Sequence, residues 1–544
     1  MEDDPDVEGT RGQPPPAPRR QAPPAGDPGT SGTLDAHGEP LTDPGAESDV
    51  ALPGDAASTA DPEIRSDAAG GGQGPPPGTE ATAAHPTGGL PPDSRRAKVI
   101  AKWGSAGRRP LLLLAGVGLI DALDRGVLAG VLTAIQEDLG VNDFQMGLLD
   151  SAYIITGLLF ALPAGYLSDR ARRTRVIAIV MALWTVFIAG TAAVRTYWQA
   201  FVVRTAVGIG DTIDDPASQS LMADYYPARV RGRAYAYFRA TPTVGRALGI
   251  AVGGAVGAML GWRAAFLVAA LPGILLAIGV WRLREPARGE SDLATPAVGS
   301  ADEASTRAKT TVWSDVRTLL RIRSLRALVL GTAVGSGTLS GLAFWAVAYH
   351  ERHSDMPAAT AAGIVGALIL LASLGGTLAG GSIADRVRGK VAGAPMLGAG
   401  LSMGTGIVLL FCSFIEGIPV WGMRIPLQAA AVALIVGALP ATFAMTSEVV
   451  PASLRGTGFS LVKVSSTIIG TIAPPLVGWI SDQRTYITAS GRETGDLGFA
   501  FSMTVPLVLI GAFLLIRGRH TVEDDKVAAE AATLAQHEGE EPTA

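Results

Sequence analysis

The 544-residue chain has one cysteine, six histidines and few charged side chains. Because Cys412 is alone, an intramolecular disulfide and a cysteine-based metal cluster are excluded. Charged residues make up 17% of the chain, against about 25% in soluble domains, and hydrophobic residues make up 48%. No Gly-x-x-x-x-Gly-Lys-Ser/Thr motif for binding ATP is present. The composition argues against a soluble enzyme, and the formal net charge of −5 gives no sign of nucleic-acid binding.

Aromatic residues are absent from the first hundred residues, which hold half of the chain's 36 prolines. Such a segment buries too little apolar surface to offset the entropy of ordering, so we predict a disordered tail at 1–105. A cluster of basic residues lies at the end of this tail, just before the first apolar run. It indicates either a signal that orients the first membrane helix or a contact with lipid head groups. The cluster consists of Arg95, Arg96, Lys98, Lys102, Arg108 and Arg109.

Apolar runs of about 20 residues, each long enough to span a bilayer, recur from Pro110 onward. The predicted spans are 110–134, 145–168, 174–194, 198–223, 232–259, 262–282, 325–349, 357–384, 391–414, 418–447, 456–481 and 497–517. They predict an all-α integral membrane protein with twelve transmembrane helices in two bundles of six. The bundles are 106–282 and 325–517, joined by a link at 283–324 and followed by a charged tail at 518–544.

Basic residues gather in alternate links between the spans. They are Arg170, Arg172, Arg173 and Arg175 in one link, Arg229, Arg231 and Arg233 in the next, and Arg386, Arg388 and Lys390 in a third. The first link has no Arg or Lys and carries Glu137 and Asp138. The positive-inside rule therefore predicts cytoplasmic N- and C-termini in the cell membrane.

Two motifs repeat at nearly the same offset. The segment Gly165–Arg170 recurs 216 residues later at Gly381–Arg386, and Asp224-x-x-Pro-x-x-x-Arg231-Gly recurs 224 residues later, from Glu448 to Gly456. Both pairs fall at matching links of the two halves. An even number of helices in each half predicts a parallel repeat related by an axis along the membrane normal.

The Gly-x-x-x-Asp-Arg link resembles the signature of the major facilitator superfamily, with Arg172 where that signature prefers Gly. Asp124–Leu132, Gly165–Arg170 and Val207–Asp211 resemble the Spinster-type branch, with Asp211 where that branch usually has Glu. The resemblance implies transport of lysolipids or sphingoid phosphates in animals and of amphipathic molecules in bacteria. Arg246 stands where the Spinster pattern has a small residue.

Charged residues inside predicted spans are costly and usually mark a transport pathway or a paired site. The candidates for substrate binding and proton coupling are Asp121, Asp124, Arg125, Arg204, Asp211, Asp215, Arg239, Arg246 and Lys463, and Asp214 lies beside them. Asp121 can pair with Arg125 at spacing i, i+4. Arg204, Asp211 and Asp215 share one helix face, and Pro216 is predicted to kink that helix. The alternative is a structural ion-pair network.

A second set of polar residues lies at the ends of the predicted spans and suits gating better than substrate binding. The gating candidates are Gly165, Asp169, Arg170, Arg173, Asp224, Arg231, Asp385, Arg386, Glu448 and Arg455. In addition, the glycine run from Gly245 to Gly254 predicts close packing of the fifth helix against a neighbour.

These features predict a monomeric secondary transporter with no cofactor, driven by the proton gradient, in contact with membrane lipids. We expect an amphipathic anionic or zwitterionic substrate, such as a lysolipid, held by the arginines. The alternatives are transport of a sugar, organic acid or drug, a membrane enzyme, and a sensor that does not transport. An enzyme would need a catalytic constellation, yet no histidine falls in the predicted spans, since His350 and His353 are assigned to a link.

Overall fold

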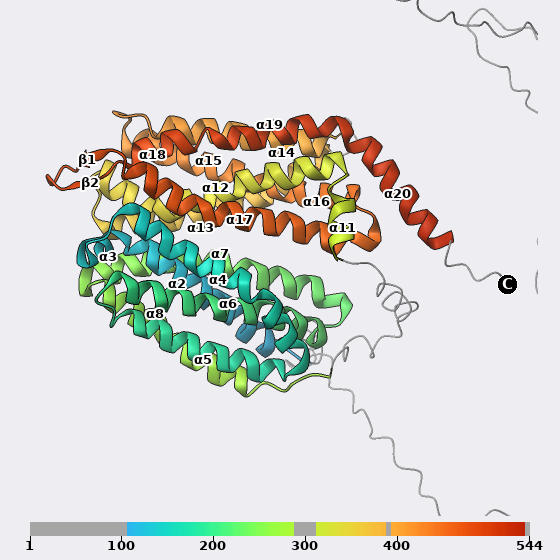
Figure 1. Cartoon of the computed structure of the whole chain (residues 1–544), viewed down its shortest axis with the longest axis horizontal. Helices are drawn as coiled ribbons and strands as arrows, with labels where there is room; N and C mark the ends of the chain where they lie inside the picture. The colour runs from blue at the N-terminus through green and yellow to red at the C-terminus, as the bar shows by residue number, and fades with distance from the viewer. Residues whose placement is uncertain (1–105, 288–311, 388–392, 539–544) are drawn as a thin grey trace, which may run out of the picture. The chain divides into compact units, whose positions relative to one another are not determined.

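The computed structural model describes residues 106–287, 312–387 and 393–538 (Figure 1). The first helices are α2 (Arg109–Gly130), α3 (Leu132–Leu139), α4 (Asp143–Arg170), α5 (Arg173–Thr191), α6 (Tyr197–Tyr225), α7 (Ala228–Leu260) and α8 (Trp262–Trp281). After α11 (Val312–Leu319) follow α12 (Arg323–His353), α13 (Ala358–Val387), α14 (Ala394–Ser413), the π-turn η2 (Val420–Arg424), α15 (Ile425–Gly437) and α16 (Leu439–Val449). The chain ends with η3 (Ala452–Leu454), α17 (Arg455–Ser481), β1 (Thr485–Ile487), β2 (Glu493–Gly495), α18 (Leu497–Thr504), α19 (Leu507–Gly518), η4 (Arg519–Thr521) and α20 (Val522–Glu538).

The helix boundaries follow local sequence signals. Thr196 precedes α6, and its hydroxyl accepts the Gln199 N–H, while the Asp496 carboxylate does the same for Phe499 at the start of α18. Gly261 separates α7 from α8 with a positive φ of 85°, a conformation that favours glycine. The predicted kink at Pro216 does not interrupt α6, which continues as a helix to Tyr225.

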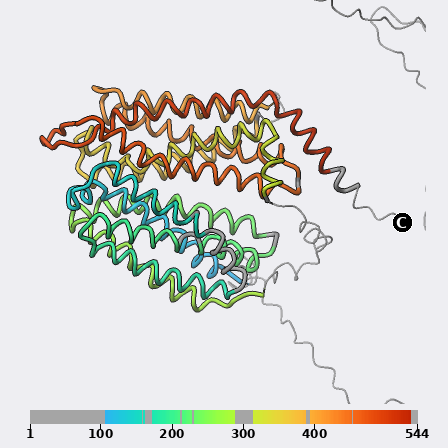
Figure 2. The backbone as a smooth tube through the Cα atoms, in the orientation of Figure 1, coloured from blue at the N-terminus to red at the C-terminus, as the bar shows by residue number. Residues whose placement is uncertain are grey.

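The helices form two groups (Figure 2). In the N-terminal group, α2–α8, α2 packs against α7, α4 against α6, and α5 against α6 and α8. In the C-terminal group, α12–α19, α12 packs against α17 and α19, and α15 against α13 and α14. The groups meet along a seam, where α4 contacts α17 and α7 contacts α13.

Glycines allow the closest helix contacts, as the Gly245–Gly254 run predicts. A Cβ atom added at Gly249 of α7 would overlap the carbonyl oxygen of Leu123 in α2, and one at Gly380 of α13 would overlap that of Gly437 in α15. Small residues at such crossings let backbones approach and give van der Waals contact where lipid offers no hydrophobic driving force.

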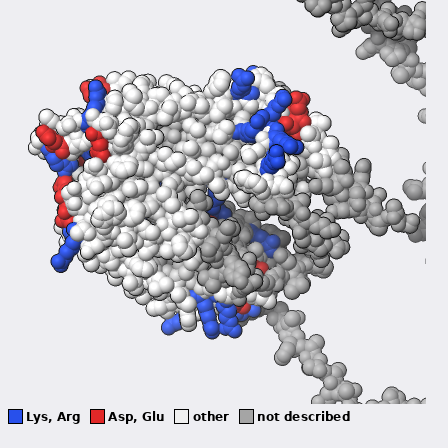
Figure 3. All heavy atoms as spheres, viewed as in Figure 1, with Lys and Arg blue, Asp and Glu red and all other residues white. Residues whose placement is uncertain are grey.

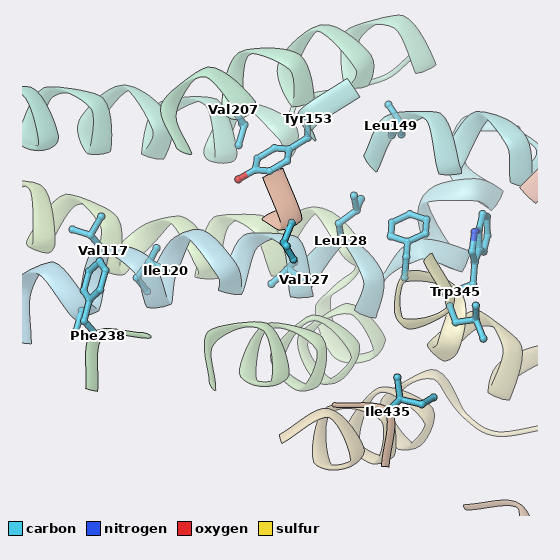
Figure 4. Close-up of a cluster of buried hydrophobic side chains, with 14 of the residues drawn as sticks. Val117, Ile120, Val127, Leu128, Leu149, Tyr153, Val207, Phe238, Trp345 and Ile435 are labelled. Carbon is cyan, nitrogen blue, oxygen red and sulfur yellow. The ribbon is translucent and has the colours of Figure 1, made fainter. Parts of the chain in front are cut away.

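A buried apolar cluster fills the space between the helices. Figure 4 shows Val127 and Leu128 of α2 near Tyr153 of α4, with Val207 of α6 nearby, and all four are at most 2% exposed. On the outside, large apolar side chains are exposed, such as Leu275 at 73% and Leu378 at 73%. On the face in Figure 3, charged side chains gather toward the two ends of the helices, and most of the surface between them is uncharged. This pattern suits a surface in contact with lipid.

Nine helical segments in the described ranges are long and apolar enough to cross a membrane. They are Arg173–Thr191, Val230–Leu260, Trp262–Trp281, Arg323–His353, Ala358–Arg386, Ala394–Ser413, Val420–Val449, Arg455–Ser481 and Leu497–Thr533. The predicted span 418–447 contains a π-turn and two helices, η2, α15 and α16.

Several polar segments are more ordered than the sequence suggested. α11 lies in the predicted link 283–324, the β1–β2 hairpin lies between the last two predicted spans, and α20 continues the chain beyond residue 517. The assignment of His350 and His353 to a link is wrong, because both lie in the last turn of α12. The predicted tail at 1–105, residues 288–311 of the link and residues 539–544 lie outside the described residues.

Candidate functional site

A cavity of about 510 Å³ lies between the two groups and is lined by polar and charged side chains. Six of the predicted site residues or their neighbours line it: Asp121, Arg125, Asp214, Asp215, Arg239 and Lys463. The lining residues of α6, α7 and α17 lie in the part of each helix nearer to Tyr225, Ala228 and Arg455. We refer to that end of the helices as the α20 end and to the opposite end, with α3 and the β1–β2 hairpin, as the hairpin end.

Asp121, Arg125 and Tyr153 form one connected unit in the wall of this cavity. Arg125 donates to Asp121 at 2.6 Å, which confirms the pairing predicted from their spacing. The Tyr153 hydroxyl donates to the other oxygen of Asp121 at 2.9 Å, and the Arg125 guanidinium lies over the Tyr153 ring, 5.1 Å from its centroid. Tyr153 comes from α4 and was absent from the sequence candidates.

Asp124 and Arg204 form a buried ion pair beside Tyr153. The Arg204 Nη1 donates to Asp124 Oδ2 at 2.7 Å, and both side chains are 1% exposed. The Arg204 guanidinium lies over the Tyr153 ring, 5.4 Å from its centroid. Arg204 of α6 therefore pairs with an acid of α2, a partner that lies on another helix. The second Asp124 oxygen and two Arg204 nitrogens have no hydrogen-bond partner among the described residues. A pair with unused hydrogen-bonding capacity in a dry site is costly to keep and can be rearranged.

Other predicted residues lie nearer to the open part of the cavity. Lys463 of α17 lies 3.7 Å from Asp215 of α6, and the two side chains are 71% and 36% exposed. Arg239 donates to the Gln219 side chain at 2.7 Å. Asp211 belongs to α6, but its side chain lies outside the described residues.

A second cavity, of about 240 Å³, is lined mainly by apolar residues of the C-terminal group. Arg246 of α7 lines it from the N-terminal group, opposite Ser336 and Ser340 of α12 and Ser373 of α13. The Arg246 Nε is buried without a hydrogen-bond partner among the described residues. This cavity thus combines one guanidinium, several hydroxyls and an apolar wall.

Asp150 is a charged residue that the sequence analysis missed, although it lies inside the predicted span 145–168. It is 8% exposed in α4, one turn before Tyr153. The same reasoning that selected Asp121 and Asp124, a carboxylate within an apolar run, would have found it.

The gating candidates differ in their surroundings. Arg173 is 2% exposed and binds Asp224 at 2.5 Å and Glu285 at 3.0 Å. Asp385 and Arg386 are exposed at the end of α13. The side chains of Gly165–Arg170 in α4 lie outside the described residues.

The two copies of the second motif make matching backbone contacts. Arg231 donates to the carbonyl oxygens of Ala223 and Tyr226 at 3.0 Å, and Arg455 donates to that of Ser447 at 3.0 Å. Each arginine thereby satisfies carbonyls at the end of the preceding helix. Glu448, the counterpart of Asp224, binds Lys526 of α20 at 2.6 Å.

At the hairpin end, a buried polar network joins the two groups. Arg352 of α12 donates to both carboxylate oxygens of Asp143 at 2.8 Å, and Ser481 donates to Asp143 at 2.7 Å. Gln136 of α3 bonds to both Asp143 and Arg352. The Asp482 carboxylate accepts the backbone N–H groups of Asp143 and Phe144 at the start of α4. The bonds of Arg352, Ser481 and Asp482 run from the C-terminal group to the N-terminal group, so they join the two groups at the hairpin end.

Sequence and structure comparisons identify the family. The sequence profile of the Major Facilitator Superfamily matches residues 114–437, so the chain belongs to this superfamily and is a multi-pass membrane transporter. Among its relatives, spinster homolog 3 of Danio rerio is 26% identical over 78% of this chain and 87% of its own length. The probable L-galactonate transporter of Escherichia coli is 27% identical over 51% of this chain, and the chain spans 61% of that relative.

Solved structures show the same fold. A bacterial homologue of the human lysosomal transporter Spinster, in an inward-facing and unoccupied conformation, matches with a TM-score of 0.67 and 22% identity over 76% of this chain and 97% of its own. A D-xylose–proton symporter matches with a TM-score of 0.59 and 15% identity over 75% of this chain and 96% of its own.

Proposed function

We propose that this transporter is a secondary active carrier that works by alternating access and is driven by the proton gradient. Two features support this mechanism: the Asp143–Arg352 network closes the hairpin end, and the 510 Å³ cavity lies toward the α20 end. In a carrier whose two halves rock around a central site, the contacts that close one end must break before that end can open.

Breaking the hairpin-end network tests this mechanism. The change Arg352→Met leaves Asp143 buried without its guanidinium, so the hairpin end should open. Spin labels at Asn142 and Ile487 should then move apart, and labels at Arg233 and Ser382 should move together. The control is Arg263→Met, which removes an exposed ion pair with Asp138 at the same end. Distances that stay unchanged in Arg352→Met would contradict alternating access through this network.

The proposed architecture has twelve transmembrane helices in two parallel halves, 106–282 and 325–517. α2, α4 and α6 add to the nine apolar segments, since they have 22, 28 and 29 residues. Among their charged residues, Asp124, Asp150 and Arg204 are buried in the protein. The matching contacts of Arg231 and Arg455 support the repeat. We place the protein in the cell membrane as a monomer, with the α20 end and both termini in the cytoplasm, in line with the basic links there.

The buried Asp124–Arg204 pair is the proposed proton switch, and it is the observation that carries the function. A carboxylate in a dry site binds a proton readily once its arginine turns away. Asp124→Asn mimics the protonated state, so it should abolish proton-driven transport and leave substrate exchange measurable in proteoliposomes. Asp138→Asn, at an exposed pair, should leave both intact. Normal dependence on the proton gradient in Asp124→Asn would refute the switch and leave Asp211 as the candidate.

The proposed substrate is an amphipath with an anionic or zwitterionic head. It is supported by the cavity that combines Arg246 with hydroxyls and an apolar wall, and by the similarity to spinster relatives. The similarity to a probable L-galactonate transporter favours a sugar acid as the second candidate. A thermal-shift series separates them: stabilisation by lysophosphatidate or decanoate supports the amphipath, and stabilisation by galactonate alone supports the sugar acid.

A further inference from the structure

At the α20 end of the C-terminal group, exposed arginines gather where α12 meets α19. Arg323 and Arg326 lie in the first turn of α12, and Arg517 lies in the last turn of α19. A Cβ atom added at Gly518 would overlap that of Ala327, so the arginines next to these two residues lie at one helix crossing. Figure 3 shows basic side chains over this end of the group. We call Arg323, Arg326 and Arg517 the corner arginines.

The part of α12 beside the corner arginines is open to the membrane. Along the whole of α12, which is described throughout, only Arg323, Arg326 and Leu330 are exposed. They share one face, because they are three, four and seven residues apart. Nearer the hairpin end, Gly337 and Gly341 continue this face and pack closely against α17. α17 therefore covers the face there and leaves its α20 end uncovered.

α19 presents the same order of side chains on its side of the corner. Ile510 is 53% exposed, Phe513 is 57% exposed, and the exposed Arg517 follows seven and four residues later. Residues at these spacings share a helix face. Two neighbouring helices thus place apolar side chains toward the middle of the membrane and guanidinium groups toward its surface. Acyl chains and a head group follow one another in the same order in a phospholipid.

Acids of α20 balance the corner arginines only in part. Asp525 accepts the Ser324 backbone N–H at 2.8 Å, and Glu523 lies 3.8 Å from Lys526. In the described ranges, no acid forms an ion pair with a corner arginine. The corner also lies apart from the 510 Å³ and 240 Å³ cavities, whose lining contains none of these arginines. Its excess positive charge is therefore available to a ligand other than the transported one.

We propose that this corner binds the head group of an anionic glycerophospholipid from the leaflet at the α20 end. A guanidinium can donate two hydrogen bonds to one phosphate group, and each basic side chain near the membrane surface adds attraction for anionic lipid. The acyl chains lie over Leu330 of α12 and over Ile510 and Phe513 of α19. The bound lipid thereby joins the start of α12 to the end of α19. This inference goes beyond the proposed function and does not depend on the transported substrate.

Titration of the purified full-length protein with short-chain lipids tests the site. Dihexanoyl phosphatidylglycerol should bind more tightly than dihexanoyl phosphatidylcholine, whose head group is neutral overall. Glycerol 3-phosphate, which has no acyl chains, should bind weakly. The triple variant Arg323→Gln/Arg326→Gln/Arg517→Gln should weaken the binding of phosphatidylglycerol at least about tenfold. Its melting temperature without lipid should match that of the wild type, because the three side chains are exposed.

The matched control is Arg172→Gln/Arg175→Gln/Arg282→Gln, which removes three exposed arginines at the same end of the N-terminal group. It should bind phosphatidylglycerol as the wild type does. Equal weakening in the two triple variants would show attraction by overall charge and would overturn the proposal. Equal affinity of the wild type for phosphatidylglycerol and phosphatidylcholine would do the same. Binding of glycerol 3-phosphate as tight as that of phosphatidylglycerol would assign the corner to free anions and refute a lipid site.

A photo-reactive residue separates this site from the transport cavities. Benzoylphenylalanine in place of Leu330, in nanodiscs with equal amounts of the two lipids, should label phosphatidylglycerol in excess. The control position is Leu371 of α13, which is 69% exposed and has no charged residue within two helical turns. There the two lipids should be labelled equally. The excess at Leu330 should disappear when the corner arginines are replaced by Gln. Equal labelling at Leu330 while they are present would overturn the proposal, whatever binds in the cavities.

Discussion

The two helix groups hold equivalent acids at the α20 end in different ways. In the N-terminal group, Asp224 is bound by Arg173, which is 2% exposed and also bonds to Ser220, Glu285 and the carbonyl of Pro286. In the C-terminal group, Glu448 is bound by Lys526 of α20, and both side chains are about a quarter exposed. The first group thus stabilises its end from within, whereas the second depends on the segment that follows its last span.

The largest expected effect comes from removing the buried cation of the N-terminal group. Arg173→Ala deletes an ion pair with Asp224 and another with Glu285, and breaking a buried pair costs about 3–5 kcal/mol. We expect the melting temperature in detergent to fall sharply. The partially exposed Lys526→Ala serves as the matched control, with a loss of about 0–1 kcal/mol. Equal losses of stability in the two variants would contradict the claim that the N-terminal group depends more strongly on its buried cation than the C-terminal group depends on Lys526.

The paired arginines of the repeated motif give a smaller contrast. Arg231 is half-buried and donates to two carbonyls, whereas Arg455 is exposed and donates to one. At about 1 kcal/mol for each net hydrogen bond, Arg231→Ala should lower the stability about twice as much as Arg455→Ala. Thermal unfolding of the two variants side by side measures the difference. A greater loss of stability in Arg455→Ala would contradict the larger contribution that we assign to Arg231.

Much of the fold follows from apolar runs alone, because length and hydropathy determine which segments cross a membrane. The Asp121–Arg125 pair was also predictable, since it depends only on helical spacing. The Asp124–Arg204 pair was not, because its partners are 80 residues apart and meet only through the packing of α2 with α6. Likewise, nothing in the tail composition predicts that Val522 of α20 is fully buried against the C-terminal group.

Truncation after Thr521 tests how far the C-terminal group depends on α20. It removes the Lys526–Glu448 pair, the bond from the Ser324 N–H to the Asp525 carboxylate and the burial of Val522. We expect a loss of about 1–3 kcal/mol, more than in Lys526→Ala, because burial of an apolar side chain is lost as well. Lys526→Arg should keep the wild-type melting temperature. An unchanged melting temperature after truncation would show that α20 is not needed by this group.

The smallest expected effect is a pH dependence confined to the N-terminal group. Partial burial raises the pKa of Glu285, but hydrogen bonds from the Thr174 backbone and hydroxyl and from Arg173 outweigh it, so the pKa lies below its ordinary value of 4.5. A carboxylate with a lowered pKa in the folded state stabilises the protein above that ordinary value, and the contribution is lost as the pH falls through the folded-state pKa. The wild type should therefore lose part of its stability on acidification below pH 4.5.

The variant Glu285→Gln should already be less stable than the wild type at neutral pH, and acidification should lower its stability by a smaller amount. Melting curves of both proteins from neutral to acid pH measure this, and parallel pH profiles would show that Glu285 does not contribute to the charge network around Arg173.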